Sequence, residues 1–500
     1  MEETLKDESI QNQRIEAIKI SMGRSIFYFI ALLINIVASI VLARKLVPQD
    51  YAIYQLVTKR IISYGTIPLS IFSLWIYRYV VEKNEGSYYA SLTFSIGQAL
   101  FSFILGIILV LLYTKVNPII LIIAGVSLAL QAFYYTVRTI VDAARPLRMG
   151  FLELIYRISY ASLIFVLIYL ISASLLYAFI GTAISFLLSS ILAIYWLKDK
   201  IHSDKIVNTK KILKEWTLGS HATVLGVVFG LIPSFDVMIA YPLVGDLVVA
   251  AFFVVSSIST LLRDSTNVGL RYLHSYVLRT GDLRTALRNM ELSLAIVIPF
   301  LMYGVIYPKY VVYVYNPIYS WASIAISVFL ITAIIEILNN GIGQIASGSI
   351  KDRGVKAAKG FAKMNILGLI PSLFYIGSLA LIFVLFKGIS LTYLILLWAI
   401  VYLIRYAISA IVIAKFFLPS NVIKTIIKEM IPRIILYSLI SLAISYFLKP
   451  LGAPSPRLLT DIKYIAIPGL IEVALFYLVV IGIDKGVRRH LIKLLKERIL

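Results

Sequence analysis

The sequence predicts an all-α polytopic membrane protein with about 14 transmembrane helices, arranged as two six-helix lobes around a central cavity plus two extra C-terminal helices. Three observations predict it. The 500 residues are 60% hydrophobic and 14% charged, with a mean hydropathy of +0.92, which is more apolar surface than a soluble core hides. Apolar stretches of membrane-spanning length recur along the whole chain, and the loops between them alternate in cation content.

The apolar stretches that are long enough to cross about 30 Å of hydrocarbon define the expected helices. Their approximate ranges are 20–44, 51–79, 87–113, 118–141, 149–171, 174–197, 217–243, 246–263, 286–308, 319–346, 363–386, 389–416, 431–448 and 463–483. The first 18 residues are polar, and no cleavable signal sequence follows them. We therefore expect the first helix to act as the targeting signal.

Lysine and arginine gather in every second loop, apart from the Arg44–Lys45 loop and the last outer loop, "KPLGAPSPRLLTDIK", and this alternation sets the expected orientation. Segments such as "KDKIHSDKIVNTKKILKEW" and "KGVRRHLIKLLKERIL" are strongly basic, whereas "YPLVGD" and "ISAS" carry no cation. By the positive-inside rule, both termini lie in the cytoplasm and the protein resides in the cytoplasmic membrane. The formal net charge of +22 then reflects topology and attraction to anionic membrane lipids, so nucleic acid is not an expected partner.

A short repeat suggests the domain organisation. "ARKLVPQDYAIYQLV" follows the first helix and "AYPLVGDLVVAAFFVV" follows the seventh, each with Leu-Val, a turn, an acid and a new apolar run. Two such halves are a common transporter plan. The expected parts are a cytoplasmic N-terminal segment 1–19, an N-lobe 20–197, a basic linker 198–216, a C-lobe 217–417, helices 13 and 14 within 418–483, and an amphipathic cytoplasmic tail 484–500.

The first junction also carries a family resemblance. Ala43, Arg44, Leu46, Pro48, Asp50, Tyr51 and Tyr54 match an Ala-Arg-x-Leu-Gly-Pro-Glu-Asp/Glu-Tyr-Gly-x-Tyr pattern, with Val47 and Ala52 in place of its two glycines. In this motif and in its helix count the sequence resembles the polysaccharide transporter branch of the multidrug/oligosaccharidyl-lipid/polysaccharide (MOP) flippase superfamily. The resemblance implies export of a lipid-linked oligosaccharide, carried on polyprenyl or dolichyl (pyro)phosphate, by alternating access and for glycan assembly.

Charged residues inside predicted spans are the candidate site residues, because an ionisable group in the bilayer is costly unless it faces water or a partner. Guanidinium and ammonium groups suit a phosphate-bearing head group. The expected cationic cavity consists of Lys59, Arg60, Arg157, Arg405, Arg24 and Arg138. Candidate ion, proton or polar cavity residues are Asp236, Glu336, Asn340 and Gln344.

Each of these residues also has a structural interpretation. Lys59 and Arg60 could anchor to the outer head groups by snorkelling, and Arg24 and Arg138 could be topological anchors. Arg157 lies four residues after Glu153, the spacing of an intrahelical ion pair. The acid and amides around 336–344 could join helices by hydrogen bonds, and Asp236 could be a solvated helix end.

Two other function classes compete with the flippase. An ion-coupled multidrug or cation antiporter of the same superfamily would need acidic residues in the N-lobe to attract cationic substrates. Within the predicted helices of the N-lobe, Glu153 is the acidic residue that lies deep in a span. A membrane glycosyltransferase or polymerase would need a large extracytoplasmic loop, which the sequence lacks. There are no cysteines, no phosphate-binding glycine loop and no metal-ligand cluster in the sequence, so we expect no cofactor and no metal. We expect a monomeric chain, and H⁺ or Na⁺ is a possible coupling ion.

Overall fold

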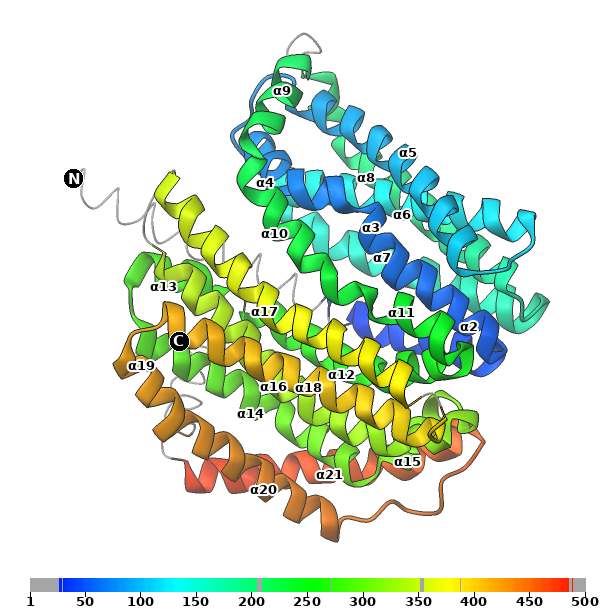
Figure 1. Cartoon of the computed structure of the whole chain (residues 1–500), viewed down its shortest axis with the longest axis vertical. Coiled ribbons are helices and arrows are strands. Elements are labelled where there is room, and N and C mark those ends of the chain that lie inside the picture. Colours follow the sequence, from blue (N-terminus) through cyan, green and yellow to red (C-terminus); the bar gives the residue numbers. More distant parts are fainter. Residues whose placement is uncertain are drawn as a thin grey trace. The chain divides into compact units, whose positions relative to one another are not determined.

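The computed structural model describes residues 27–204 except 29, 209–350 except 271, 355–484 except 387, and residue 488. Its regular elements are all helices within these residues, and the chain divides into two compact units, 1–250 and 251–500 (Figure 1). The predicted N-terminal segment 1–19 lies outside the described residues, as does the tail 484–500 apart from residues 484 and 488.

In unit 1, residues 30–45 are helical. The helices that follow are α2 (Pro48–Gln55), α3 (Ile62–Gly65), α4 (Ile67–Val81), α5 (Ser87–Tyr113), α6 (Pro118–Ala144), α7 (Pro146–Ile164), α8 (Leu175–His202), α9 (Thr209–Gly219), α10 (His221–Leu231) and α11 (Phe235–Val244). The π-helical segment Leu56–Ile61 joins α2 to α3, and a second π-helical segment, Phe165–Ile171, extends α7.

The helix α12 (Asp246–Leu270) begins in unit 1, and most of it lies in unit 2. The other helices of unit 2 are α13 (Tyr272–Thr280), α14 (Leu283–Ile306), α15 (Pro308–Tyr315), α16 (Ser323–Ser349), α17 (Val355–Leu385), α18 (Leu391–Phe417), α19 (Ser420–Thr425), α20 (Ile431–Phe447) and α21 (Leu458–Ile483). A π-helical segment, Ile426–Met430, links α19 to α20.

Twelve helices of the described residues are long and apolar enough to cross a membrane. They correspond to the third to fourteenth predicted spans, so the chain is a multi-pass membrane protein, but the count of 14 is not confirmed. The first predicted span, 20–44, lies partly outside the described residues. The second, 51–79, is broken into α2, a π-helical segment, α3 and α4, and Pro68 in the first turn of α4 accounts for the break between α3 and α4.

The helices bury small or polar residues and expose large apolar ones, as expected for a protein in a membrane. On α5 the buried residues are small or polar, including Ser91, Ser95 and Ser102, while Ile104 and Leu111 are exposed. Small residues allow close helix packing, and large apolar ones suit lipid. Figure 1 shows α5, α6 and α8 packed side by side in unit 1.

The junction motif after the first helix has a structural role. Pro48 occupies the first turn of α2, where a missing N–H costs nothing. Tyr51 and Tyr54 are buried, and the Tyr54 hydroxyl lies 2.7 Å from the hydroxyls of both Tyr160 on α7 and Thr182 on α8. The motif therefore fixes α2 against two other helices of unit 1.

Candidate functional site

The candidate site begins at the break between α3 and α4. The N–H of Leu69 would bond the Gly65 carbonyl in an unbroken helix, but here it donates to Gln98 Oε1 at 2.9 Å. The Gly65 carbonyl instead accepts from Gln98 Nε2 and, at 2.7 Å, from the Ser102 hydroxyl. The buried side-chain amide of Gln98 on α5 thus replaces the missing hydrogen bond between the Leu69 N–H and the Gly65 carbonyl. Side chains satisfy the backbone groups of broken membrane helices in this way.

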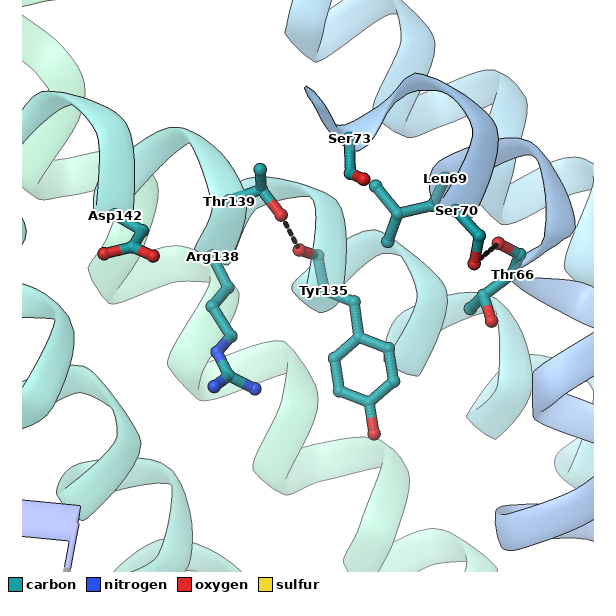
Figure 2. A pocket seen from close by; sticks show the side chains of 8 residues that line it. All are labelled: Thr66, Leu69, Ser70, Ser73, Tyr135, Arg138, Thr139 and Asp142. Carbon is teal, nitrogen blue, oxygen red and sulfur yellow. Dashed lines mark hydrogen bonds between the residues drawn. The ribbon is translucent and has the colours of Figure 1, made fainter. Parts of the chain in front are cut away.

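A pocket of about 390 Å³ opens beside this break in unit 1. One wall is Thr66, Leu69, Ser70 and Ser73, and the other is Tyr135, Arg138, Thr139 and Asp142 on α6. Both sets follow the spacing i, i+3, i+4, i+7, which places each on one face of its helix. Figure 2 shows the two faces opposite each other, with five of the eight side chains bearing hydroxyls.

Arg138 connects the pocket to a buried ion network. Its Nη1 lies 3.4 Å from Glu153 Oε2 on α7, and its Nη2 donates to the Tyr28 hydroxyl. Glu153 is buried, and its Oε1 accepts from Arg157 Nε at 3.0 Å. Arg157 also donates to Asn35 Oδ1 at 2.8 Å. The i, i+4 pair predicted from the sequence is therefore present, and a second arginine shares its acid.

The charges of this region are compensated. Arg138 and Arg157 share Glu153, and Asp142 adds a second carboxylate to the pocket wall. A pocket with one base, one acid and many hydroxyls suits a polar or amphipathic molecule of small net charge. This does not by itself support the strongly cationic cavity expected from the sequence.

The two adjacent cations of the second predicted span lie in the π-helical segment Leu56–Ile61. Lys59 is exposed, whereas Arg60 is 22% exposed and donates from Nε and Nη2 to Asp236 on α11, both at 2.9 Å. Asp236 is buried and also accepts from the N–H of Val237. The candidate ion site at Asp236 is thus held by a guanidinium in this conformation.

The remaining candidates lie in unit 2. Glu336 on α16 is buried and accepts from Arg263 on α12 at 2.6 Å. Arg405 on α18 stands over the rings of Tyr375 and Tyr406, at 5.1 and 4.8 Å from their centroids, which is cation–π geometry. Asn340 and Gln344 are half-buried on α16. Arg24 lies outside the described residues.

Sequence reasoning missed Gln98, Arg263 and the pocket walls apart from Arg138, which was among the expected cavity residues. The pocket walls were detectable, since polar residues at i, i+3, i+4, i+7 stand out in an apolar helix. Arg263, the last residue of the predicted span 246–263, was not named as a candidate, but it belongs to α12 and binds Glu336. Gln98 gives no signal in the sequence, because its role depends on a break in another helix.

Comparison with known proteins identifies the fold. No model of a protein family matches the sequence, and no curated protein matches it either. Among solved structures, a multidrug resistance MATE family transporter of the MOP superfamily in its inward-facing conformation matches with a TM-score of 0.57 and 13% identity, over 81% of this chain and 99% of that one. The outward-facing conformation of such a transporter matches with a TM-score of 0.55 and 15% identity, over 82% and 96%.

A third structure, from Pyrococcus furiosus, is a MOP superfamily transporter in which reverse polarity of the binding pocket suggests a different function. It matches with a TM-score of 0.53 and 14% identity, over 81% of this chain and 95% of that one. The chain therefore has the fold of MATE transporters of the MOP superfamily. The polysaccharide transporter branch is not specifically indicated by these structures.

Proposed function

We propose that this protein is an ion-coupled, alternating-access transporter that exports an amphipathic organic molecule across the cytoplasmic membrane. The observation that carries the proposal is a hydroxyl-rich pocket with one base and one acid, set in a membrane protein with the MATE transporter fold. The neighbours are transporters, so the proposal contains no enzymatic step, and nothing in the comparisons supports the glycosyltransferase alternative.

Multidrug-type antiport is the first candidate for the substrate. Two of the structural neighbours are multidrug transporters, and the arginines of the pocket region are paired with carboxylates. Asp142 on the pocket wall gives a cationic or zwitterionic compound an ionic partner. In this proposal a gradient of H⁺ or Na⁺ drives export. The two transporting lobes are residues 20–197 and 217–417, helices 13 and 14 lie outside them, and both termini face the cytoplasm.

A lipid-linked oligosaccharide is the second candidate. The pocket supplies hydroxyls from Thr66, Ser70, Ser73, Tyr135 and Thr139, which match the hydrogen-bonding needs of sugars. Arg138 adds a guanidinium suited to phosphate. Lys59, Arg60, Arg157 and Arg405 stay proposed contributors to substrate binding in another conformation.

The test is transport by the purified protein in proteoliposomes with an imposed pH or Na⁺ gradient. Cationic and anionic fluorescent dyes are compared for the wild type, Arg138→Ala and Asp142→Asn. Loss of a charge-assisted hydrogen bond costs about 1.5–3 kcal/mol, or roughly ten- to a hundredfold in affinity. A cationic substrate predicts the larger loss in Asp142→Asn, and an anionic substrate predicts it in Arg138→Ala.

Arg145→Ala and Asp199→Asn are the matched controls, because these residues form an ion pair in the same unit, with Asp199 exposed, and do not line the pocket. Both should transport normally. A parallel assay follows a lipid-linked oligosaccharide in the same liposomes. If neither dye nor lipid moves above the protein-free rate under either gradient, the proposed function is wrong.

A further inference from the structure

Most buried carboxylates in the membrane-spanning helices are ion-paired with arginine. Among the described residues these are Glu153, Asp236, Glu291 and Glu336, with nitrogen–oxygen distances of 3.4 Å or less. Such pairing offsets the cost of removing a charge from water. Two further buried carboxylates lie on α21: Asp461, in its first turn, accepts from the N–H of Ser455, and Glu472 lies deeper in the helix. In the described part of the chain, no lysine, arginine or histidine lies within ion-pair distance of Glu472.

Glu472 lies near the middle of α21 and is fully buried. Its Oε1 accepts from the Ser441 hydroxyl of α20 at 2.6 Å. Ser445, one turn along α20, faces the same carboxyl group. Among the described residues, neither Glu472 Oε2 nor Ser445 Oγ has a hydrogen-bond partner.

The other groups around Glu472 are neutral. The Tyr303 ring of α14 packs against Gly469, one turn before Glu472 on α21, and Tyr477 donates its hydroxyl to the Ile296 carbonyl. A charged cluster of Arg288, Glu291, Arg433 and Asp484 lies at the end of α21. Asp484 is twelve residues beyond Glu472, or about 18 Å along a helix.

We propose that Glu472 is a proton-binding site in the helix pair α20–α21, occupied by a proton in this conformation. An ionised carboxylate without a cation in an apolar interior is strongly unfavourable, so the neutral acid is the stable form. A proton makes Oε2 a donor, and we expect a small adjustment of the Ser445 side chain to bring its Oγ into place as the acceptor, which would give both unsatisfied atoms a partner. The inference goes beyond the proposed transport and does not depend on it.

Release of this proton requires water or a cation to reach the carboxylate. Opening α20 from α21 removes the Ser441 bond and exposes Glu472, so binding and release of the proton follow the packing of this pair. The site lies outside the predicted six-helix lobes. Helices 13 and 14 would then add a proton-sensitive element rather than only apolar surface.

Infrared spectroscopy of the full-length protein in lipid tests this directly, because a protonated carboxyl has a C=O stretching band that a carboxylate lacks. We expect a buried carboxylic-acid band at neutral pH in the wild type and its loss in Glu472→Gln. The control is Glu429→Gln, in the exposed residue of the segment Ile426–Met430, which should keep the band. Ser445→Ala should shift the band without removing it, since it removes the proposed acceptor.

Three results would overturn the proposal. The first is a spectrum without such a band at neutral pH, and the second is a band that survives Glu472→Gln. The third is a band that Na⁺ removes at constant pH, which would make the site a metal-cation site. If Glu472→Gln fails to fold, the frequency of the carboxylic-acid band in Ser445→Ala decides the question. A band that does not shift in Ser445→Ala would count against its assignment to Glu472.

Discussion

Arg60 and Asp236 form a two-bond ion pair, with Arg60 Nε and Nη2 each 2.9 Å from a different carboxylate oxygen. The residues are 176 positions apart, and the pair joins the π-helical segment Leu56–Ile61 to α11. A planar guanidinium matches a carboxylate in this way, whereas an ammonium does not. The pair therefore fixes both the distance and the orientation of two elements of unit 1.

Removing one partner of this pair should destabilise the protein strongly. We expect Arg60→Ala to lower the free energy of unfolding by about 3–5 kcal/mol, because it leaves the Asp236 carboxylate buried without its guanidinium. Asp236→Ala should cost less, because Arg60 is 22% exposed and its charge keeps contact with solvent. The double variant should lose less than the sum of the two, and Arg60→Lys should be intermediate. Thermal unfolding in detergent at fixed lipid content measures this. Lys115→Ala, at an exposed residue of the same unit, is the control and should change little.

Additive effects of the two single substitutions would contradict a direct pair. In a double-mutant cycle the coupling energy should instead be about 0.5–3 kcal/mol. The same cycle applied to the exposed Lys115 and Asp236 should give a value near zero.

Glu153→Gln should make the arginines beside the pocket respond to anions. The substitution removes the shared carboxylate of Arg138 and Arg157, so the protein should lose stability and gain affinity for an anion. Inorganic phosphate should then raise the melting temperature of Glu153→Gln more than that of the wild type. Glu82→Gln, from the exposed pair with Arg78, should show no added response. Equal phosphate effects in all three proteins would count against an anion-accessible arginine pair.

Two glycines on α16 allow a sharp test of packing in unit 2. A methyl group at Gly348 would lie 2.6 Å from the His274 carbonyl oxygen and 2.9 Å from Val277 Cβ on α13, whereas one at Gly343 meets nothing within 4 Å. Gly348→Ala should destabilise the protein by about 1–3 kcal/mol through overpacking. Gly343→Ala should be neutral or stabilising by up to about 1 kcal/mol. Equal melting temperatures for the two variants would show that α13 does not pack as described.

Helix positions were predictable because hydrocarbon thickness sets helix length. Twelve predicted spans correspond to the structure's membrane-length helices, although 431–448 starts late because Lys424, Lys428 and Glu429 occupy the first turns of Ser420–Phe447. The Glu153–Arg157 pair was predictable because both residues share a helix. Arg60–Asp236 was not, because no local pattern tells which distant helix packs against a residue. Glu472 offered a signal, a lone acid in the middle of an apolar stretch, that was not used.

Gln98 should control both stability and the shape of the pocket. Its amide satisfies the Leu69 N–H and the Gly65 carbonyl at the break between α3 and α4, which carries one wall of the pocket. Gln98→Ala leaves the Leu69 N–H without a partner in a buried site, at a cost of about 1–3 kcal/mol. Gln98→Glu retains an acceptor for Leu69, and its neutral acid form, which is favoured in a buried site without a cation, keeps an O–H that can donate to the Gly65 carbonyl, so its loss should be smaller. Gly97→Ala, at an exposed neighbour with open space, is the control. Hydrogen exchange at Leu69 separates this account from general loss of packing: it should accelerate more in Gln98→Ala than in Gln98→Glu. Similar exchange rates in the two variants would mean that the side chain acts by filling space rather than by bonding the broken backbone.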